Sequence, residues 1–219
     1  MTRQYWRPAN LLNPVPAVMI SCADENGNAN VMTAAWAGTV CSDPVMVSVS
    51  IRKERYSHAM IMQTGEFVIN LTTRKLAKVT DFVGVRSGRD IDKFNLEGDL
   101  KITKEPSLKV KAPCIKESPI CLECKVKEVL HLGTHDMFVA EVVSTNVNEE
   151  YLDENGRLDL AKADLIAYSH GEYYALGEYL GKFGYSVRKK PEALKKPQSP
   201  KKPRKKVSKK TKINKTGKK

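Results

Sequence analysis

The segment RKERYSH, residues 52–58, carries the side chains best suited to bind an anion. Arg52, Lys53 and Arg55 directly precede Ser57, which we expect to cap the start of a helix. Free backbone N–H groups at a helix start, the helix dipole and three cations together favour a bound phosphate or carboxylate. Composition alone also fits a solvated basic loop beside an ordinary helix cap, so both interpretations stay open here.

The segment NVMTAAWAGTVCSDP, residues 30–44, is poor in large side chains apart from Trp36. Main chain with small side chains allows a flat ring to approach closely. Asn30, Thr33 and free backbone groups would then bond the polar edge of a heterocycle, and Trp36 would shield one flank. The alternative is tight packing of a strand against its neighbour, with Trp36 in the core.

Five of the eight tyrosines lie in the segment YSHGEYYALGEYLGKFGYS, residues 168–186. Its glycines alternate with aromatic residues and do not have the spacing of a phosphate-binding loop. Aromatic side chains between glycines suit a pocket lid or a subunit interface. His170 is the one titratable group of catalytic type in this segment.

Common catalytic signatures are missing from the chain. It has no GxGxxG after a first strand, no GxxxxGK[ST], no HExxH and no GxSxG. CLEC, residues 121–124, is a lone CxxC inside an expected strand, so we expect ordinary packing, with redox or metal chemistry as the alternative. His131 and His135 have a helix-face metal spacing, but Gly133 between them argues against a helix. We therefore expect no metal site.

Strands dominate the hydrophobic pattern. In VMVSVSI, residues 45–51, the apolar Val45, Val47, Val49 and Ile51 alternate with Met46, Ser48 and Ser50, as in a half-buried strand. Further strands are expected at 15–22, 30–37, 66–71, 121–132 and 136–148, the last two paired around Gly133. Asn26-Gly27 and the segment DENGR at 153–157 have the composition of tight turns.

Two helices are expected among these strands. The first begins near Ser57 and ends before Gly65, and the second covers about 74–83, with Leu76, Val79 and Phe82 at helical spacing. Strands in neighbouring runs with a few inserted helices predict a mainly β fold. We expect an antiparallel barrel with inserted helices rather than a doubly wound parallel sheet.

Charge divides the chain into a body and a tail. Residues 189–219 hold 15 of the 37 Lys and Arg residues and one acid, whereas residues 1–188 have a net charge near −2. The tail is also rich in proline and poor in apolar residues, which predicts disorder. We expect a folded domain at 1–188. Five cysteines at uneven spacings argue against a disulfide framework, and the absence of a signal peptide or membrane span indicates a cytoplasmic protein.

These segments, taken in order, resemble one known family. VPAVMISCADENGNANVMTAAWAGTVCSDPVMVSVSI is followed by RKERYSHAMIMQTGEFVINL, then DKF, ESPICLECKV and YSHGEYYALGEYLG. The series, which covers about residues 10–186, is similar to the flavin reductase-like, FMN-binding split-barrel family, and within it to the flavoredoxin branch. The resemblance implies an antiparallel split barrel and a homodimer with one FMN per subunit near the interface.

The resemblance also implies which residues contact FMN. Residues Asn30, Val31, Met32, Thr33, Ala34, Ala35 and Trp36 would line the isoalloxazine ring. Ser50, Ile51 and Arg52 would approach the ribityl chain and phosphate, Arg55 and Ser57 would hold the phosphate, and Lys93 of DKF would reach the cofactor. His170 and the aromatic residues after it would close the pocket, from the same subunit or its partner.

Three functions remain open on the sequence. The first is an FMN-dependent oxidoreductase that reduces free flavin or another acceptor with NAD(P)H. The second is an electron carrier of flavoredoxin type that works between redox proteins. In the third, the basic tail binds nucleic acid or an acidic protein, through contacts that weaken steeply with salt.

Overall fold

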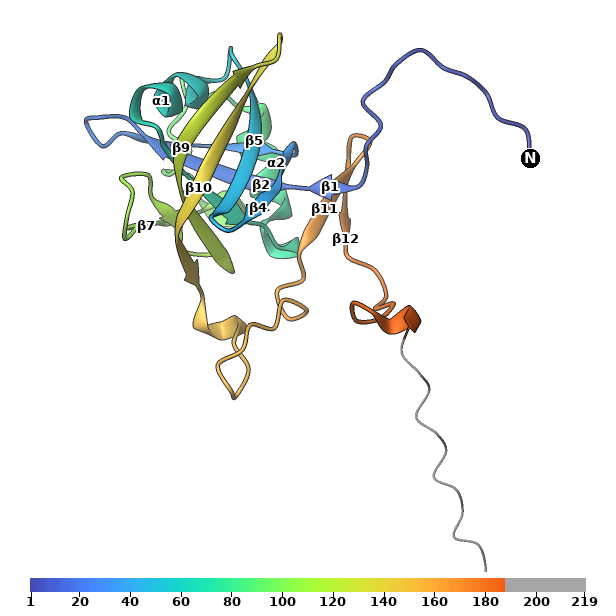
Figure 1. Ribbon diagram of the computed structural model, residues 1–219. Helices are drawn as coiled ribbons and strands as arrows, with labels where there is room; N and C mark the ends of the chain where they lie inside the picture. The colour runs from blue at the N-terminus through green and yellow to red at the C-terminus, as the bar shows by residue number, and fades with distance from the viewer. Residues whose placement is uncertain (188–219) are drawn as a thin grey trace, which may run out of the picture. The chain divides into compact units, whose positions relative to one another are not determined.

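Seven antiparallel strands form the main sheet in the computed structural model, which describes residues 1–187. Their order is β3-β2-β6-β9-β10-β5-β4. The strands are β2 (Val18–Ala23), β3 (Ala29–Ala34), β4 (Ala37–Ser42), β5 (Val45–Arg52), β6 (Glu66–Leu71), β9 (Ile120–His131) and β10 (His135–Val147). The long β9–β10 hairpin crosses the sheet in front of β2 in Figure 1. The predicted antiparallel pairing of these two strands around Gly133 is confirmed.

Two smaller sheets accompany the main one. β1 (Val15–Pro16), β11 (Ile166–Ser169) and β12 (Glu172–Ala175) pair in the order β1-β11-β12, and β7 (Lys104–Glu105) pairs with β8 (Cys114–Ile115). The chain forms two units, Met1–Gly177 and a second unit that begins at Glu178. All the strands named above belong to the first unit. The predicted disordered tail, 189–219, lies outside the described residues.

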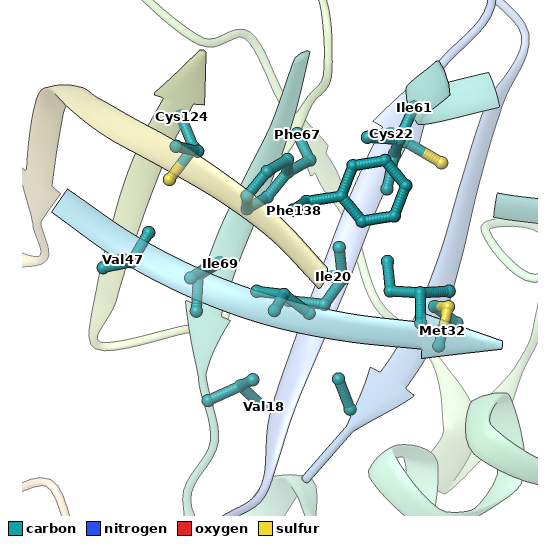
Figure 2. Packing of buried hydrophobic residues seen from close by; sticks show 14 of the residues in the cluster. Val18, Ile20, Cys22, Met32, Val47, Ile61, Phe67, Ile69, Cys124 and Phe138 are labelled. Atoms are coloured by element: carbon teal, nitrogen blue, oxygen red, sulfur yellow. The ribbon is translucent and has the colours of Figure 1, made fainter. Parts of the chain in front are cut away.

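Side chains that alternate along the strands fill the interior of the curved sheet. In β5, Val47, Val49 and Ile51 are buried while Ser48 and Ser50 are only partly covered, as the pattern predicts. Val45, predicted in the same buried row, is exposed because it lies at the strand start, paired with Ser42 at the end of the edge strand β4. Figure 2 shows Val47 and Phe138 in one interior cluster with Phe67, Ile69 and Cys124. Phe138 is fully buried, and burial of such apolar surface is the main stabilising contribution to the fold.

The outer face of β2 and β3 is covered by a helix, which explains why β2 is buried on both faces. Met19 and Val31 point outward and pack against Val79 and Val83 of α2 (Ala77–Val85). A 3₁₀ turn at Arg74–Leu76 precedes α2, so the predicted helix at 74–83 exists but divides into two elements. Within residues 1–187, no helix has the length and apolar character needed to cross a membrane.

The other helix, α1 (Tyr56–Thr64), lies at one end of the main sheet (Figure 1). It ends at Gly65 in the left-handed conformation, as predicted. The helix begins near Ser57, as predicted, but the predicted cap was wrong: Arg55 is the N-cap, and no side chain caps the helix. Ser57 instead lies in the first turn of α1, where it is buried and its hydroxyl accepts a hydrogen bond from Asn30 of β3.

Candidate functional site

The two edge strands of the main sheet, β3 and β4, are joined by the two-residue link Ala35–Trp36. The predicted strand at 30–37 therefore breaks after Ala34. The Ser50 N–H donates to the Trp36 carbonyl at 2.9 Å, which fixes the link against β5. The Trp36 ring stacks on His135 with centroids 4.7 Å apart. The opening of the sheet between β3 and β4 is here called the seam. Its backbone carries few large side chains, and the Trp36–His135 pair lies beside it.

A cavity of about 410 Å³, here called the split cavity, lies along this seam. Nine predicted site residues line it: Met32, Thr33, Ala34, Ala35, Trp36, Ser50, Ile51, Arg52 and Arg55. Burial and the nearby Arg52 lower the pKa of His135, which also lines the cavity, so its ring favours the neutral form. Backbone, small side chains and a neutral aromatic pair make this cavity suitable for a flat ring.

A tyrosine pair from the small sheet lines the same cavity. Tyr168 and Tyr173 lie edge to face, with ring centroids 5.4 Å apart. Burial, with the neighbouring Asp81 as the second cause, raises the pKa of Tyr173 to about 12, so its hydroxyl stays protonated. The sequence analysis placed Tyr173 in an aromatic lid, and in the structure this side chain does border the cavity.

A second cavity of about 560 Å³, here called the arginine cavity, adjoins the first. The two share Met32, Arg52, Arg55 and Val85 in their linings. Five cations border the arginine cavity against the single acid Glu54; they are Arg52, Arg55, Arg86, Arg89 and Lys93. This excess of positive charge suits an anion with more than one negative charge.

Arg55 and Lys93 are held in place by backbone carbonyls. Arg55 Nη1 donates to the Gly84 carbonyl at 2.7 Å, and Lys93 Nζ donates to the carbonyls of Val31 and Val83, each at 2.8 Å. Burial, followed by repulsion from Arg55, lowers the pKa of Lys93 to about 8. A buried ammonium beside a guanidinium gains stability when an anion approaches both.

Asn30 and Ser57 connect β3 to the start of α1 at this cavity. Asn30 Nδ2 donates to Ser57 Oγ at 2.8 Å, and both residues are buried and line the arginine cavity. The neighbouring Gly88 fits only because it has no side chain. A Cβ there would lie 2.2 Å from Asn30 Oδ1 and 2.9 Å from Tyr56 Cδ1. The loop that contains Gly88 is therefore pressed directly against the Asn30–Ser57 pair.

Two predicted site residues lie outside both linings. Val31 faces α2, because alternation along β3 turns its side chain outward, and only its carbonyl reaches Lys93. His170 is exposed at the turn between β11 and β12, next to Gly171, which does line the split cavity. Its φ of 50° is in the left-handed region. The other twelve predicted cofactor contacts border one cavity or the other, and their contact with a cofactor stays a prediction.

The sequence analysis missed the loop Arg86–Arg89, which borders the arginine cavity with two arginines, a serine and Gly88. Its signal was the run RSGRD just before the DKF segment. Nothing local marks this run as part of a site. Only the position of α2 against β3 brings it to Asn30 and Ser57. The same holds for Asp81 of the split cavity, which comes from α2.

The cysteines and histidines singled out by spacing have structural surroundings. Cys121 and Cys124 are buried in different apolar clusters, which agrees with ordinary packing of the CLEC strand. His131 bonds to Asp136, whereas His135 packs on Trp36. In the part of the chain that the structure describes, no three His, Cys, Asp or Glu side chains are arranged to hold a metal ion.

Comparisons with known proteins identify the family and the fold. The family model for the flavin reductase like domain matches residues 12–177. The flavoredoxin of Desulfovibrio vulgaris (Miyazaki F) has a similar structure, with a TM-score of 0.77 and 31% identity over 85% of this chain and 100% of that chain. A putative flavin reductase with a split barrel domain from Shewanella frigidimarina has a TM-score of 0.70 and 26% identity, over 79% of this chain and 87% of that chain.

A sequence relative extends the comparison to another organism. An uncharacterised protein of Pyrococcus abyssi is 32% identical over 163 residues, which are 74% of this chain and 91% of the relative. The structural similarities confirm the predicted antiparallel split barrel, with the main sheet left open between β3 and β4.

Proposed function

This chain belongs to the flavin reductase like domain family, and we propose that it is an FMN-binding oxidoreductase. In this proposal it transfers electrons from NAD(P)H to free flavin or to another acceptor. The family and the similarity to flavoredoxin support flavin binding. The choice of FMN rests on the site geometry, and the proposed reaction rests on the family.

One observation carries the proposal: a cavity suited to a flat ring adjoins a cavity rich in cations. In our assignment the isoalloxazine ring lies along Met32–Trp36 in the split cavity. The phosphate lies in the arginine cavity, near Arg55, Ser57 and Lys93. A phosphate monoester carries nearly two negative charges at neutral pH, which matches the cation excess there. FMN has both parts, whereas riboflavin lacks the phosphate.

The residues present fit such a group. The small side chains of Thr33, Ala34 and Ala35 leave room for the ring in the split cavity, and the five cations of the arginine cavity match the charge of the phosphate. The bound flavin supplies the electron chemistry, and the protein binds and orients it. Arg55 and Lys93 would neutralise the phosphate, the Ala34–Trp36 backbone would lie against the ring, and Trp36 with His135 would shield one flank from water.

We further propose a homodimer, as the family resemblance implies, and a cytoplasmic location. His170 lies outside the cavities of its own chain, so we propose that it reaches the cofactor of a partner subunit. Exposed apolar side chains on and beside β4, Trp36, Val40 and Val45, support an interface near the seam. Sedimentation of the purified chain measures this assembly, and a monomer would contradict it.

The second candidate function is an electron carrier between protein partners, which the similarity to flavoredoxin favours. Anaerobic stopped-flow mixing of the flavin-loaded chain with NADH or NADPH separates the two. Rapid bleaching of the flavin absorbance supports the oxidoreductase. Bleaching by a reduced iron–sulfur protein alone supports the carrier.

We propose residues 1–188 as the flavin-binding domain, with the basic tail as an appendage that binds nucleic acid or an acidic partner. Deletion of 189–219 should leave the flavin content unchanged. Loss of flavin with the tail would contradict this boundary. Binding of the full chain to nucleic acid that disappears with the tail, and that falls steeply with salt, would support the tail's proposed role.

A further inference from the structure

A buried carboxylate that the proposed function does not use lies beside residues 54–57, here called the anion-binding segment. Asp136, near the start of β10, has a side chain only 3% exposed. Its Oδ2 lies 2.8 Å from His58 Nε2, and its Oδ1 lies 2.8 Å from His131 Nδ1 and 3.5 Å from Lys53 Nζ. One carboxylate therefore contacts three basic side chains from three parts of the chain.

These contacts keep Asp136 ionised. The hydrogen bond from His131 is the largest cause that lowers its pKa to about 2, and His58 and Lys53 act in the same direction. The histidine rings differ in exposure, with 12% for His58 and 65% for His131. His58 also packs edge to face on Phe138, with centroids 5.4 Å apart. The Asp136–His58 contact is thus the buried part of the cluster.

Two partners of Asp136 flank the anion-binding segment in sequence. Lys53 precedes Arg55 in the loop after β5, and His58 lies in the first turn of α1. Asp136 pairs with Ile51 across β5 and β10, one residue before Arg52. The carboxylate therefore holds both ends of the short segment that presents Arg55 and Ser57 to the arginine cavity.

Hydrogen bonds to backbone carbonyls connect the same segment to α2 and to the loop that follows α2. Arg55 donates to the Gly84 carbonyl, and Arg89 Nη1 donates to the Glu54 carbonyl at 3.0 Å. The Arg55 N–H also donates to the Arg52 carbonyl at 3.1 Å, which closes a tight turn. These bonds restrain residues 52–55 on the α2 side, while Asp136 restrains them from the β9–β10 hairpin.

We propose that Asp136 is a positioning residue that sets the preference of this site for a phosphorylated flavin over an unphosphorylated one. The inference rests on the proposed function, because it assumes that the phosphate lies beside Arg55 and Ser57. Bonds to a phosphate need donors held to within a few tenths of an ångström. Loss of the Asp136 contacts frees Lys53 and His58, and with them the segment between.

The test compares FMN and riboflavin affinities of Asp136→Asn and the wild-type full chain, by quenching of flavin fluorescence. The amide keeps the size of the side chain but loses the charge that two histidines and Lys53 contact. We expect FMN binding to weaken about tenfold and riboflavin binding to change less than about twofold. Equal weakening of both ligands, or tighter FMN binding, would overturn the inference.

Glu141→Gln is the matched control. Glu141 is on the same strand and pairs with Lys127 at 2.7 Å, but it lies away from the anion-binding segment. Its replacement should leave both affinities unchanged. A change in Glu141→Gln equal to that in Asp136→Asn would overturn the inference, since loss of one acid on β10 would then explain the result.

A milder variant keeps the test valid if Asp136→Asn does not fold. Lys53→Met removes a half-exposed side chain that contacts Asp136 at one end of the segment, so it should leave the fold intact. We expect about a threefold loss of FMN affinity with riboflavin unchanged; no change would overturn the inference. Failure of the proposed function looks different, because the wild type itself would then show no preference for FMN.

Discussion

The split cavity and the arginine cavity adjoin and share Arg52 and Arg55, yet the rest of their linings differ. The split cavity follows the link between two edge strands and presents backbone, small side chains and aromatic rings. The arginine cavity is bordered by the start of α1, the end of α2 and the loop Arg86–Arg89, and it is lined by five cations. Shape decides what the first can hold, and charge decides what the second can hold. Substitutions should therefore affect different parts of one ligand.

The largest difference should come from Arg55→Ala. Arg55 is fixed on the Gly84 carbonyl and faces the proposed phosphate. Loss of a charge-assisted hydrogen bond costs about 1.5–3 kcal/mol, so FMN affinity should fall by roughly 10- to 100-fold. Riboflavin affinity should change only a few-fold. Calorimetric titration with both ligands measures this, and an equal loss for both would remove Arg55 from the phosphate site.

Trp36→Ala tests the other cavity. Trp36 borders the proposed ring position and stacks on His135. Removal of this aromatic surface should weaken FMN and riboflavin alike, by about tenfold. Fluorescence quenching titrations give both constants. A loss confined to FMN would contradict the assignment of the flavin ring to the split cavity.

Gly88→Ala tests the loop that the sequence analysis missed. The added methyl group would meet Asn30 Oδ1, so the loop must shift and Ser57 loses its fixed partner. FMN affinity should fall about fivefold, and more than riboflavin affinity. Gly38→Ala is the control, since a Cβ there meets nothing within 4 Å and Gly38 borders neither cavity. Unchanged FMN binding in Gly88→Ala would separate this loop from the site.

The smallest effect concerns pH. The pKa of Lys93 in the free chain is lowered to about 8, and a bound phosphate favours the charged ammonium, so binding raises it. FMN affinity should be full below pH 8 and fall about threefold as pH rises from 8 to 9. Lys93→Met should remove this decline. Titrations at several pH values check it, and an identical slope in the variant would exclude Lys93 as the cause.

The sequence predicts the parts of the fold and site that depend on local patterns. Three local patterns are the alternation along β5, the helix end at Gly65 and the small residues after Asn30. In the structure they correspond to a half-buried strand, the end of α1 and the edge strand β3. The break of the strand at Ala35–Trp36 is not a local pattern, because it depends on where β3 and β4 lie as sheet edges.

Long-range contacts explain what the sequence could not predict. Ser57 resembles an N-cap in sequence, but its hydroxyl accepts a hydrogen bond from Asn30, 27 residues away. Arg86–Arg89 resembles an ordinary loop until α2 places it over β3. Asp136 is the first residue of the strand expected at 136–148, and its contacts with His58 and Lys53 exist only in the folded chain. Charge density was visible in the sequence, whereas the partners that orient the charges were not.

Titration of the purified full chain with FMN and riboflavin at pH 7 tests the central claim most directly. The account predicts uptake of one FMN per chain with a Kd of about 1 µM or lower, and at least tenfold weaker riboflavin binding. A chain that takes up no FMN at about 100 µM, or that binds the two flavins equally, would contradict it.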